Sequence, residues 1–179
     1  MALRDTAVAL RTLREARIIK PTDPRKLVGA ASALRYWGVN YAGGFAACAA
    51  RNPHRVAIQD DDGFMTWSEL DRRSNAVANG LAARGVSHGS VVGLMCRNHG
   101  GFVLATAALA KLGATVLYLN TGFAGPQLRE VLEREGAVAL VCDEDFLALI
   151  GEDPPVELTV TDSGEGLTIS ELANTSTAT

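Results

Sequence analysis

Residues 91–119, VVGLMCRNHGGFVLATAALAKLGATVLYL, carry the clearest indication of fold class in this 179-residue chain. Two continuous apolar runs, 91–96 and 115–119, are typical of strands that are covered on both faces. The residues between them, 102–112, are apolar almost all round and are followed by Gly113, which predicts a buried helix. A strand, a buried helix and a second strand in this order predict a right-handed βαβ unit in a mostly parallel sheet.

The alternation of helices and strands continues on both sides of this unit. Upstream, Thr66-Trp67-Ser68-Glu69 has the pattern of a capping box and predicts a helix that stops near Gly85. Three further elements are expected downstream: a helix that begins at Pro126 and is followed by Gly136, a strand over 137–142 and a short helix over 146–150. We therefore expect an α/β fold, a layered and mostly parallel sheet with flanking helices.

A hairpin is expected ahead of the capping box. Short apolar runs at 56–59 and 64–65 flank Asp60-Asp61-Asp62-Gly63, and a helix over 41–51 precedes them. Three consecutive acids could bind a cation. However, Asp-Gly between apolar runs is a strong hairpin signal, so a solvated turn is the favoured interpretation.

Charge divides the chain into parts. Residues 1–35 hold eight Arg or Lys against three Asp or Glu, whereas 36–179 hold nine against seventeen. We expect a basic N-terminal extension over 1–35, an α/β subdomain over 36–160 and a polar, disordered tail over 161–179. The overall net charge of −3 gives no expectation of nucleic-acid binding.

The extension has the pattern of a short basic amphipathic helix. Leu3, Ala7 and Leu10 share one helical face, with arginines around it. Such a helix can lie on a membrane surface, which predicts a peripheral membrane contact through 1–35; packing against the chain's own domain is the favoured alternative. No signal peptide or membrane span is expected, because Arg4 and Asp5 interrupt the start and Lys111 divides the longest apolar stretch.

The three cysteines, Cys48, Cys96 and Cys142, lie far apart and form no CxxC pair. Their spacing argues against a disulfide framework and predicts a cytoplasmic protein. Cys96 and His99 have a spacing that a metal site could use, but no second pair completes such a site. We therefore expect no metal, and a small buried hydrophobic role for Cys96.

Motifs for catalysis are absent from the sequence. No GxGxxG follows a strand, and there is no GxxxxGK[ST] loop, GxSxG elbow or HExxH. Ligands of parallel sheets bind beyond the carboxyl ends of the strands. The polar residues best placed there to line the substrate side of a site are Arg97, Asn98, Asn120 and Thr121, and no catalytic residue is assigned.

The order of elements resembles that of the adenylate-forming enzymes. Residues 65–75, MTWSELDRRSN, resemble the opening motif of that superfamily, and the similarity extends over residues 41–145. The intervening matches are Gly80-Leu81, Arg84-Gly85-Val86, 89–94, Asn98, 107–114, Leu119-Asn120, Leu128, Leu132, Gly136 and Ala137. The run Tyr118-Leu119-Asn120-Thr121-Gly122-Phe123 is most similar to actinobacterial fatty-acyl-CoA synthetases.

This resemblance implies a function for a complete enzyme. Such an enzyme uses ATP and Mg²⁺ to convert a fatty acid to acyl-AMP, and then transfers the acyl group to coenzyme A. The family does this with a phosphate loop ending in Lys, a Glu for magnesium, an Asp for the ribose and a late catalytic Lys. None of these matches a position in the 179 residues. The resemblance therefore implies an N-terminal fragment that is inactive alone and uses no cofactor of its own. Without the later residues of the enzyme, the fragment is expected to self-associate through exposed surfaces, chiefly the apolar helix 102–112 and its neighbouring strands.

The sequence departs from the family pattern in two places, and two alternative functions stay open. Tyr118 and Thr121 stand where many family members have proline, and 144–151 contains no Arg or Lys with which to contact coenzyme A. One alternative is a stand-alone α/β module that binds a nucleotide, an acyl group or a protein partner without catalysis. The other is a small flavodoxin-like enzyme with its own site.

Overall fold

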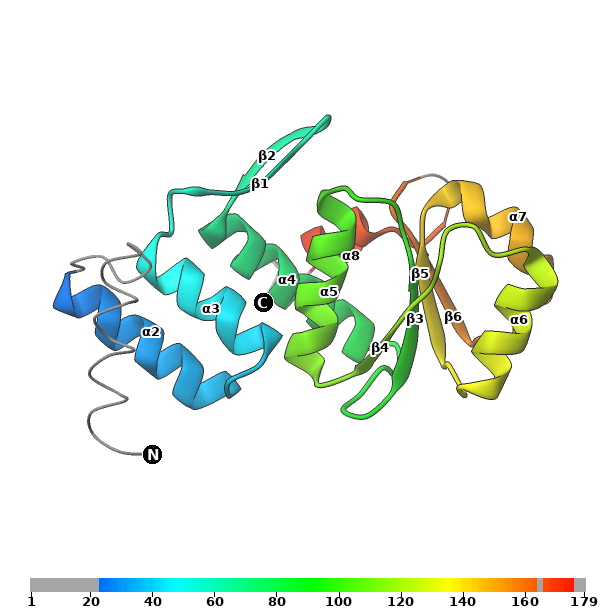
Figure 1. Cartoon of the computed structure of the whole chain (residues 1–179), viewed down its shortest axis with the longest axis horizontal. Helices are drawn as coiled ribbons and strands as arrows, with labels where there is room; N and C mark the ends of the chain where they lie inside the picture. Colours follow the sequence, from blue (N-terminus) through cyan, green and yellow to red (C-terminus); the bar gives the residue numbers. More distant parts are fainter. Residues whose placement is uncertain (1–22, 164–165, 176–179) are drawn as a thin grey trace, which may run out of the picture.

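The computed structural model describes residues 23–163 and 166–175. Helices at one end of the molecule lead into a four-stranded parallel sheet that has helices on both faces (Figure 1). The α/β fold with a mostly parallel sheet and flanking helices, expected from the sequence, is confirmed.

Two helices and a hairpin come first along the described chain. Helix α2 (Pro24–Trp37) packs on α3 (Tyr41–Arg51). Strands β1 (Val56–Asp60) and β2 (Gly63–Thr66) then pair antiparallel, with Asp60 opposite Gly63, so the expected hairpin is confirmed.

The next helix, α4 (Trp67–Ala82), begins at the capping box that the sequence predicts. The Glu69 N–H donates to Thr66 Oγ1 at 3.3 Å, and the Thr66 N–H donates to Glu69 Oε2 at 2.7 Å. Two amides that have no partner within the helix are thereby satisfied, which stabilises a helix by about 1 kcal/mol.

The main sheet has the strand order β4-β3-β5-β6, and every neighbouring pair is parallel. Its strands are β3 (Val91–Met95), β4 (Thr115–Tyr118), β5 (Ala139–Cys142) and β6 (Leu158–Thr161). The helical segments between them are α5 (Gly100–Leu112), α6 (Gly125–Arg134), the single turn η1 (Glu144–Phe146) and α7 (Leu147–Ile150).

The chain reverses its direction across the sheet beside β3. From β3 it crosses through α5 to the edge strand β4, and it then returns through α6 to β5 on the other side of β3. The topological switch point therefore lies between β3 and β5. Open parallel sheets bind ligands at this point, beyond the carboxyl ends of the strands.

Each face of the sheet has its own apolar core. On one face Val92, Leu94 and Val141 pack with residues of α4 and α5. On the other face Leu140 packs with residues of α6 and α7. Gly93 lies at the centre of this second face, and a Cβ there would come within 2.8 Å of Leu132 Cδ2, so the glycine lets α6 approach the sheet.

The end of the chain differs from the sequence expectation. A disordered tail was expected over 161–179, but the structure has helix α8 (Ile169–Thr175) in this part. Ile169, Leu172 and Ala173 are buried, and α8 packs against α4. Helix α8 is ordered because these apolar side chains are buried against α4, although the segment as a whole is polar in composition. Strand β6, which the sequence did not predict, precedes this helix.

The start of the chain differs as well. The expected border at residue 35 falls inside α2, which Asp23 begins by accepting a hydrogen bond from the Arg25 N–H. The expected helix with Leu3, Ala7 and Leu10 lies outside the described residues.

The exposed apolar patch expected on helix 102–112 is not found there. Helix α5 was the expected exposed patch, yet Leu104 to Leu109 are buried. Self-association stays a prediction. Among the described residues, no helix is long and apolar enough to cross a bilayer.

Candidate functional site

Asp143 connects the two strand ends at the switch point. Its carboxylate accepts the Arg97 N–H at 3.0 Å and the Arg97 guanidinium at 3.2 Å through Oδ2, and its Oδ1 lies 2.8 Å from His99 Nε2. His99 Nδ1 accepts the Gly101 N–H at 3.0 Å. The proton of a neutral His99 ring is therefore on Nε2, which donates to Asp143.

The same contacts determine the charge of Asp143. Its side chain is only 5% exposed, and burial by itself raises the pKa of a carboxyl group. Hydrogen bonds from His99 and from the Arg97 N–H oppose this effect and hold the pKa of Asp143 below its ordinary value of 3.8. The carboxylate is thus ionised, and it fixes the loop between β3 and α5.

Arg97 is held on its other side by the segment after β5. Its guanidinium lies 3.0 Å from the Asp145 carboxylate and 4.7 Å from the centre of the Phe146 ring. Two carboxylates therefore already neutralise its charge, although 55% of the side chain is exposed. An incoming anion would have to compete with both of them.

The structure separates the four sequence-predicted site residues into two pairs. Arg97 and Asn98 follow the central strand β3, and both are exposed. Asn120 and Thr121 follow the edge strand β4 and are also exposed, with Asn120 Oδ1 accepting the Gly122 N–H at 2.8 Å. Parallel pairing of β3 with β4 puts all four at the same edge of the sheet, and their functional role stays a prediction.

Three residues at the switch point have the donor atoms of a metal site. Cys96, His99 and Asp143 each present one ligand atom, all within 4.8 Å of one another. The sequence excluded a metal because it could not bring Asp143 to the Cys96–His99 pair. The protein already engages both ring nitrogens of His99 and both oxygens of Asp143. Burial raises the pKa of the Cys96 thiol far above its ordinary value of 9.0, which disfavours the thiolate that a metal requires. These bonds favour a structural role for the three residues.

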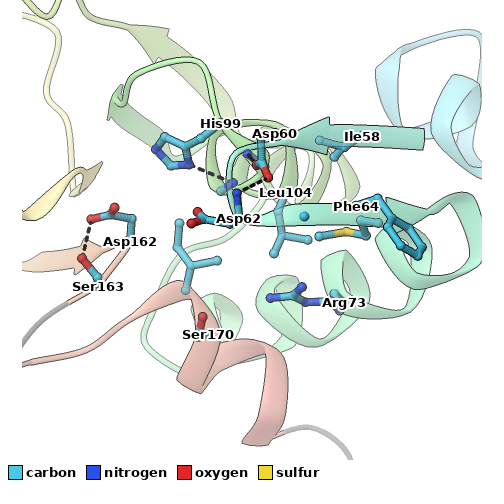
Figure 2. Close-up of a pocket in the computed structure, with 15 residues that line it drawn as sticks. Ile58, Asp60, Asp62, Phe64, Arg73, His99, Leu104, Asp162, Ser163 and Ser170 are labelled. Atoms are coloured by element: carbon cyan, nitrogen blue, oxygen red, sulfur yellow. Dashed lines mark hydrogen bonds between the residues drawn. The ribbon is translucent and has the colours of Figure 1, made fainter. Parts of the chain in front are cut away.

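A polar cavity of about 510 Å³ lies beside this point (Figure 2). It is lined by β1, β2, the start of α5, Arg73 of α4 and the chain after β6. Asp60 Oδ2 accepts the Gly100 N–H at 2.6 Å and so attaches the hairpin to the start of α5. Asp62 and Asp162 also line the cavity, which offers a ligand three carboxylates and one guanidinium.

Asp143 is not among the site residues predicted from the sequence, although it bonds to both Arg97 and His99. An acid directly after the buried run 137–142 was a usable signal. The order of the strands was needed to show which other strand end it meets.

Comparison with known proteins places this fold in a family. The AMP-binding enzyme family matches residues 45–178, which is most of the chain. The chain belongs to the AMP-binding enzyme family.

Relatives of this chain include ligases and peptide synthetases. It is 36% identical over 104 residues to the medium/long-chain-fatty-acid–CoA ligase FadD6 of Mycobacterium tuberculosis, covering 58% of this chain and 17% of the ligase. It is 33% identical over 113 residues to a plipastatin synthase of Bacillus subtilis, covering 62% of this chain and 4% of the synthase. The chain thus spans about one sixth of the length of that mycobacterial ligase.

Solved structures share the fold of this chain. The anthranilate CoA ligase AuaEII in complex with anthranoyl-AMP superposes with a TM-score of 0.69 at 26% identity, covering 75% of this chain and 27% of that one. The N-terminal domain of FACL13 from Mycobacterium tuberculosis superposes with a TM-score of 0.67 at 23% identity, covering 76% of this chain and 35% of that one. The resemblance found in the sequence is therefore confirmed for both family and fold.

Proposed function

We propose that the chain is the N-terminal α/β part of a fatty-acid–CoA ligase, and that it forms no acyl-adenylate alone. The observation that carries this proposal is the family match over 45–178, which falls on a parallel sheet with an apolar core on each face. The alignment with a mycobacterial ligase, which covers 17% of that ligase, supports it. The complete enzyme would join a fatty acid to coenzyme A with ATP and Mg²⁺. In it, Arg97, Asn98, Asn120 and Thr121 would line the substrate side of the site.

The described residues do not fit ATP by themselves. Their polar cavity presents Asp60, Asp62 and Asp162 against the single guanidinium of Arg73, and this charge balance opposes a triphosphate. The guanidinium of Arg97 is occupied by Asp143 and Asp145. In-line displacement needs the leaving pyrophosphate to be neutralised and held, and this arrangement supplies neither.

The alternative is a stand-alone module that binds a nucleotide or an acyl group without catalysis. The cavity of about 510 Å³ is the observation in its favour, because it lies within the size range of small-molecule sites. The carboxylates that line it make a cationic or neutral ligand more suitable than a nucleotide.

ATP–pyrophosphate exchange with the purified chain tests the proposal. We expect no exchange above a heat-killed control with Mg²⁺ and fatty acids of several chain lengths. Exchange that is lost in Asn120→Ala would contradict it. Calorimetry with ATP and with fatty acid forms the second arm, because saturable binding without exchange would support the module instead.

A further inference from the structure

Helix α2 and the turn after it expose large apolar side chains. Val28 is 66% exposed, Tyr36 80%, Val39 95% and Tyr41 71%. An apolar groove of about 600 Å³, lined by Val39, Tyr41, Phe45, Cys48 and Trp67 among others, continues from the turn. Large exposed apolar patches mark interaction sites on soluble proteins.

Basic residues share the outer face of α2 with these apolar side chains. Arg25, Val28, Ser32 and Arg35 follow one another at spacings of three, four and three residues, which puts them on one helical face. Ala30 lies on the opposite side and is buried. Figure 1 shows α2 at one end of the molecule, beside α3 and away from the sheet. We call Arg25, Val28, Arg35, Tyr36, Val39 and Tyr41 the α2 surface.

The charge around the α2 surface is mostly positive. Residues 23–59 contain five Arg or Lys against one acid, Asp23 at the start of α2, whereas residues 60–179 contain seven against seventeen. Among the described residues, Arg25 and Arg35 form no ion pair. The α2 surface therefore combines a net positive charge with exposed aliphatic and aromatic groups.

This combination identifies the partner by its chemistry. Anionic lipid headgroups attract Arg side chains, and the acyl region below them accepts valine and the rings of tyrosine. The family match begins at residue 45, and α2 precedes it in the chain. We propose that the α2 surface docks the chain peripherally on an anionic lipid bilayer.

Vesicle sedimentation with the full 179-residue chain tests this proposal. The vesicles are phosphatidylcholine alone, or phosphatidylcholine with about one third phosphatidylglycerol. We expect sedimentation with the anionic vesicles only, falling as salt is raised because screening weakens the attraction. Equal binding to both kinds of vesicle would overturn the charge complementarity on which the proposal rests.

Charge reversal at matched positions locates the contact. Arg25→Glu should lower the partition coefficient about tenfold or more, since one attraction is lost and one repulsion is gained. A glutamate in the first turn suits the helix dipole, so α2 should stay folded. Arg134→Glu makes the same charge change on α6, at the other end of the molecule, and should change the coefficient less than about twofold. Equal losses in the two variants would overturn the proposal.

Two further variants test the alternatives to lipid binding by the α2 surface, which are a contact made by residues 1–22 and an interface with a second copy of the chain. Arg11→Glu combined with Arg14→Glu tests residues 1–22, and loss of binding there with normal binding of Arg25→Glu would assign the contact to that segment and overturn the proposal. Val28→Ser combined with Tyr36→Ser should weaken vesicle binding severalfold. If this pair instead converts a dimer to a monomer in light scattering, the α2 surface is an interface between two copies and the proposal fails.

Discussion

Asp143 accepts two hydrogen bonds from Arg97, one from the backbone N–H at 3.0 Å and one from the guanidinium at 3.2 Å. The two residues follow β5 and β3, the strands on either side of the switch point. A buried carboxylate thus closes the place where a parallel sheet usually receives its ligand. The consequence is a rigid strand-end loop rather than an open anion site.

Replacement of Asp143 should be costly for folding. Asp143→Ala leaves the Arg97 N–H and His99 Nε2 without their partner, and we expect the free energy of unfolding to fall by about 2–3 kcal/mol. Asp145→Ala is the matched control, because the Asp145 side chain is 71% exposed, and it should cost less than about 1 kcal/mol. Urea unfolding followed by circular dichroism measures both, and equal costs would contradict the role assigned to Asp143.

The Asp143 contribution should depend on pH in a defined direction. Its folded pKa lies below the ordinary value, so the folded state binds the proton less readily than the unfolded chain. The stabilisation is therefore complete above about pH 5, well above the unfolded pKa, and is lost as the pH falls through the folded pKa. We expect the stability difference between the wild type and Asp143→Asn to shrink between about pH 5 and about pH 3. A difference that grows on acidification would have the wrong sign.

Lys111 should titrate at an unusually low pH. Its side chain is 2% exposed, and burial lowers its pKa despite hydrogen bonds to Asp71, Ser74 and Asn75. Between the lowered and the ordinary pKa the unfolded chain binds more protons, so this residue makes stability rise with pH. The Lys111 side-chain NMR signal, assigned by its absence in Lys111→Met, should move at a lower pH than that of free lysine. Titration at or above the free value would show that α4 and α5 do not enclose the amine.

Helix α8 gives a test of the corrected C-terminal part. Leu172 is 1% exposed and lies so close to α4 that a Cβ on Gly80 would come within 2.6 Å of its Cδ2. Leu172→Ala should lower the free energy of unfolding by about 2–4 kcal/mol, whereas the exposed Ser170→Ala should change it by less than about 0.5 kcal/mol. An unchanged free energy of unfolding in Leu172→Ala would contradict the packing of α8 on α4 and support the disordered tail expected from the sequence.

Local signals in the sequence were sufficient for most elements. The Thr66–Glu69 box, the Asp-Gly turn and the continuous apolar runs each depend on neighbours in the chain, so they could be predicted. Strand β6 was missed because Thr159 and Thr161 interrupt its apolar pattern. Helix α8 could have been predicted, because Thr168 and Glu171 have the spacing of a capping box. In the structure the Glu171 N–H donates to Thr168 Oγ1 at 3.1 Å, and the Thr168 N–H donates to Glu171 Oε2 at 3.0 Å.

The candidate site was less accessible to prediction. Its residues come together only because β5 pairs with β3, and pairing order is a long-range property of the fold. Arg97 was selected for its position after β3, but its neutralisation by Asp143 and Asp145 could not be read from the strand ends alone. The polar cavity depends in addition on the hairpin, through the contact of Asp60 with Gly100.

The central claim is that this chain supplies the N-terminal part of an AMP-forming ligase, and a segment exchange tests it most directly. Residues 45–178 would replace the matching segment of the mycobacterial ligase that is 36% identical, and fatty-acid-dependent ATP–pyrophosphate exchange would be measured. A Gly93→Val version, whose side chain would collide with Leu132 and Leu140, serves as the misfolded control. We predict exchange well above that control. A chimera that melts cooperatively like the parent ligase and yet shows no exchange would contradict the account.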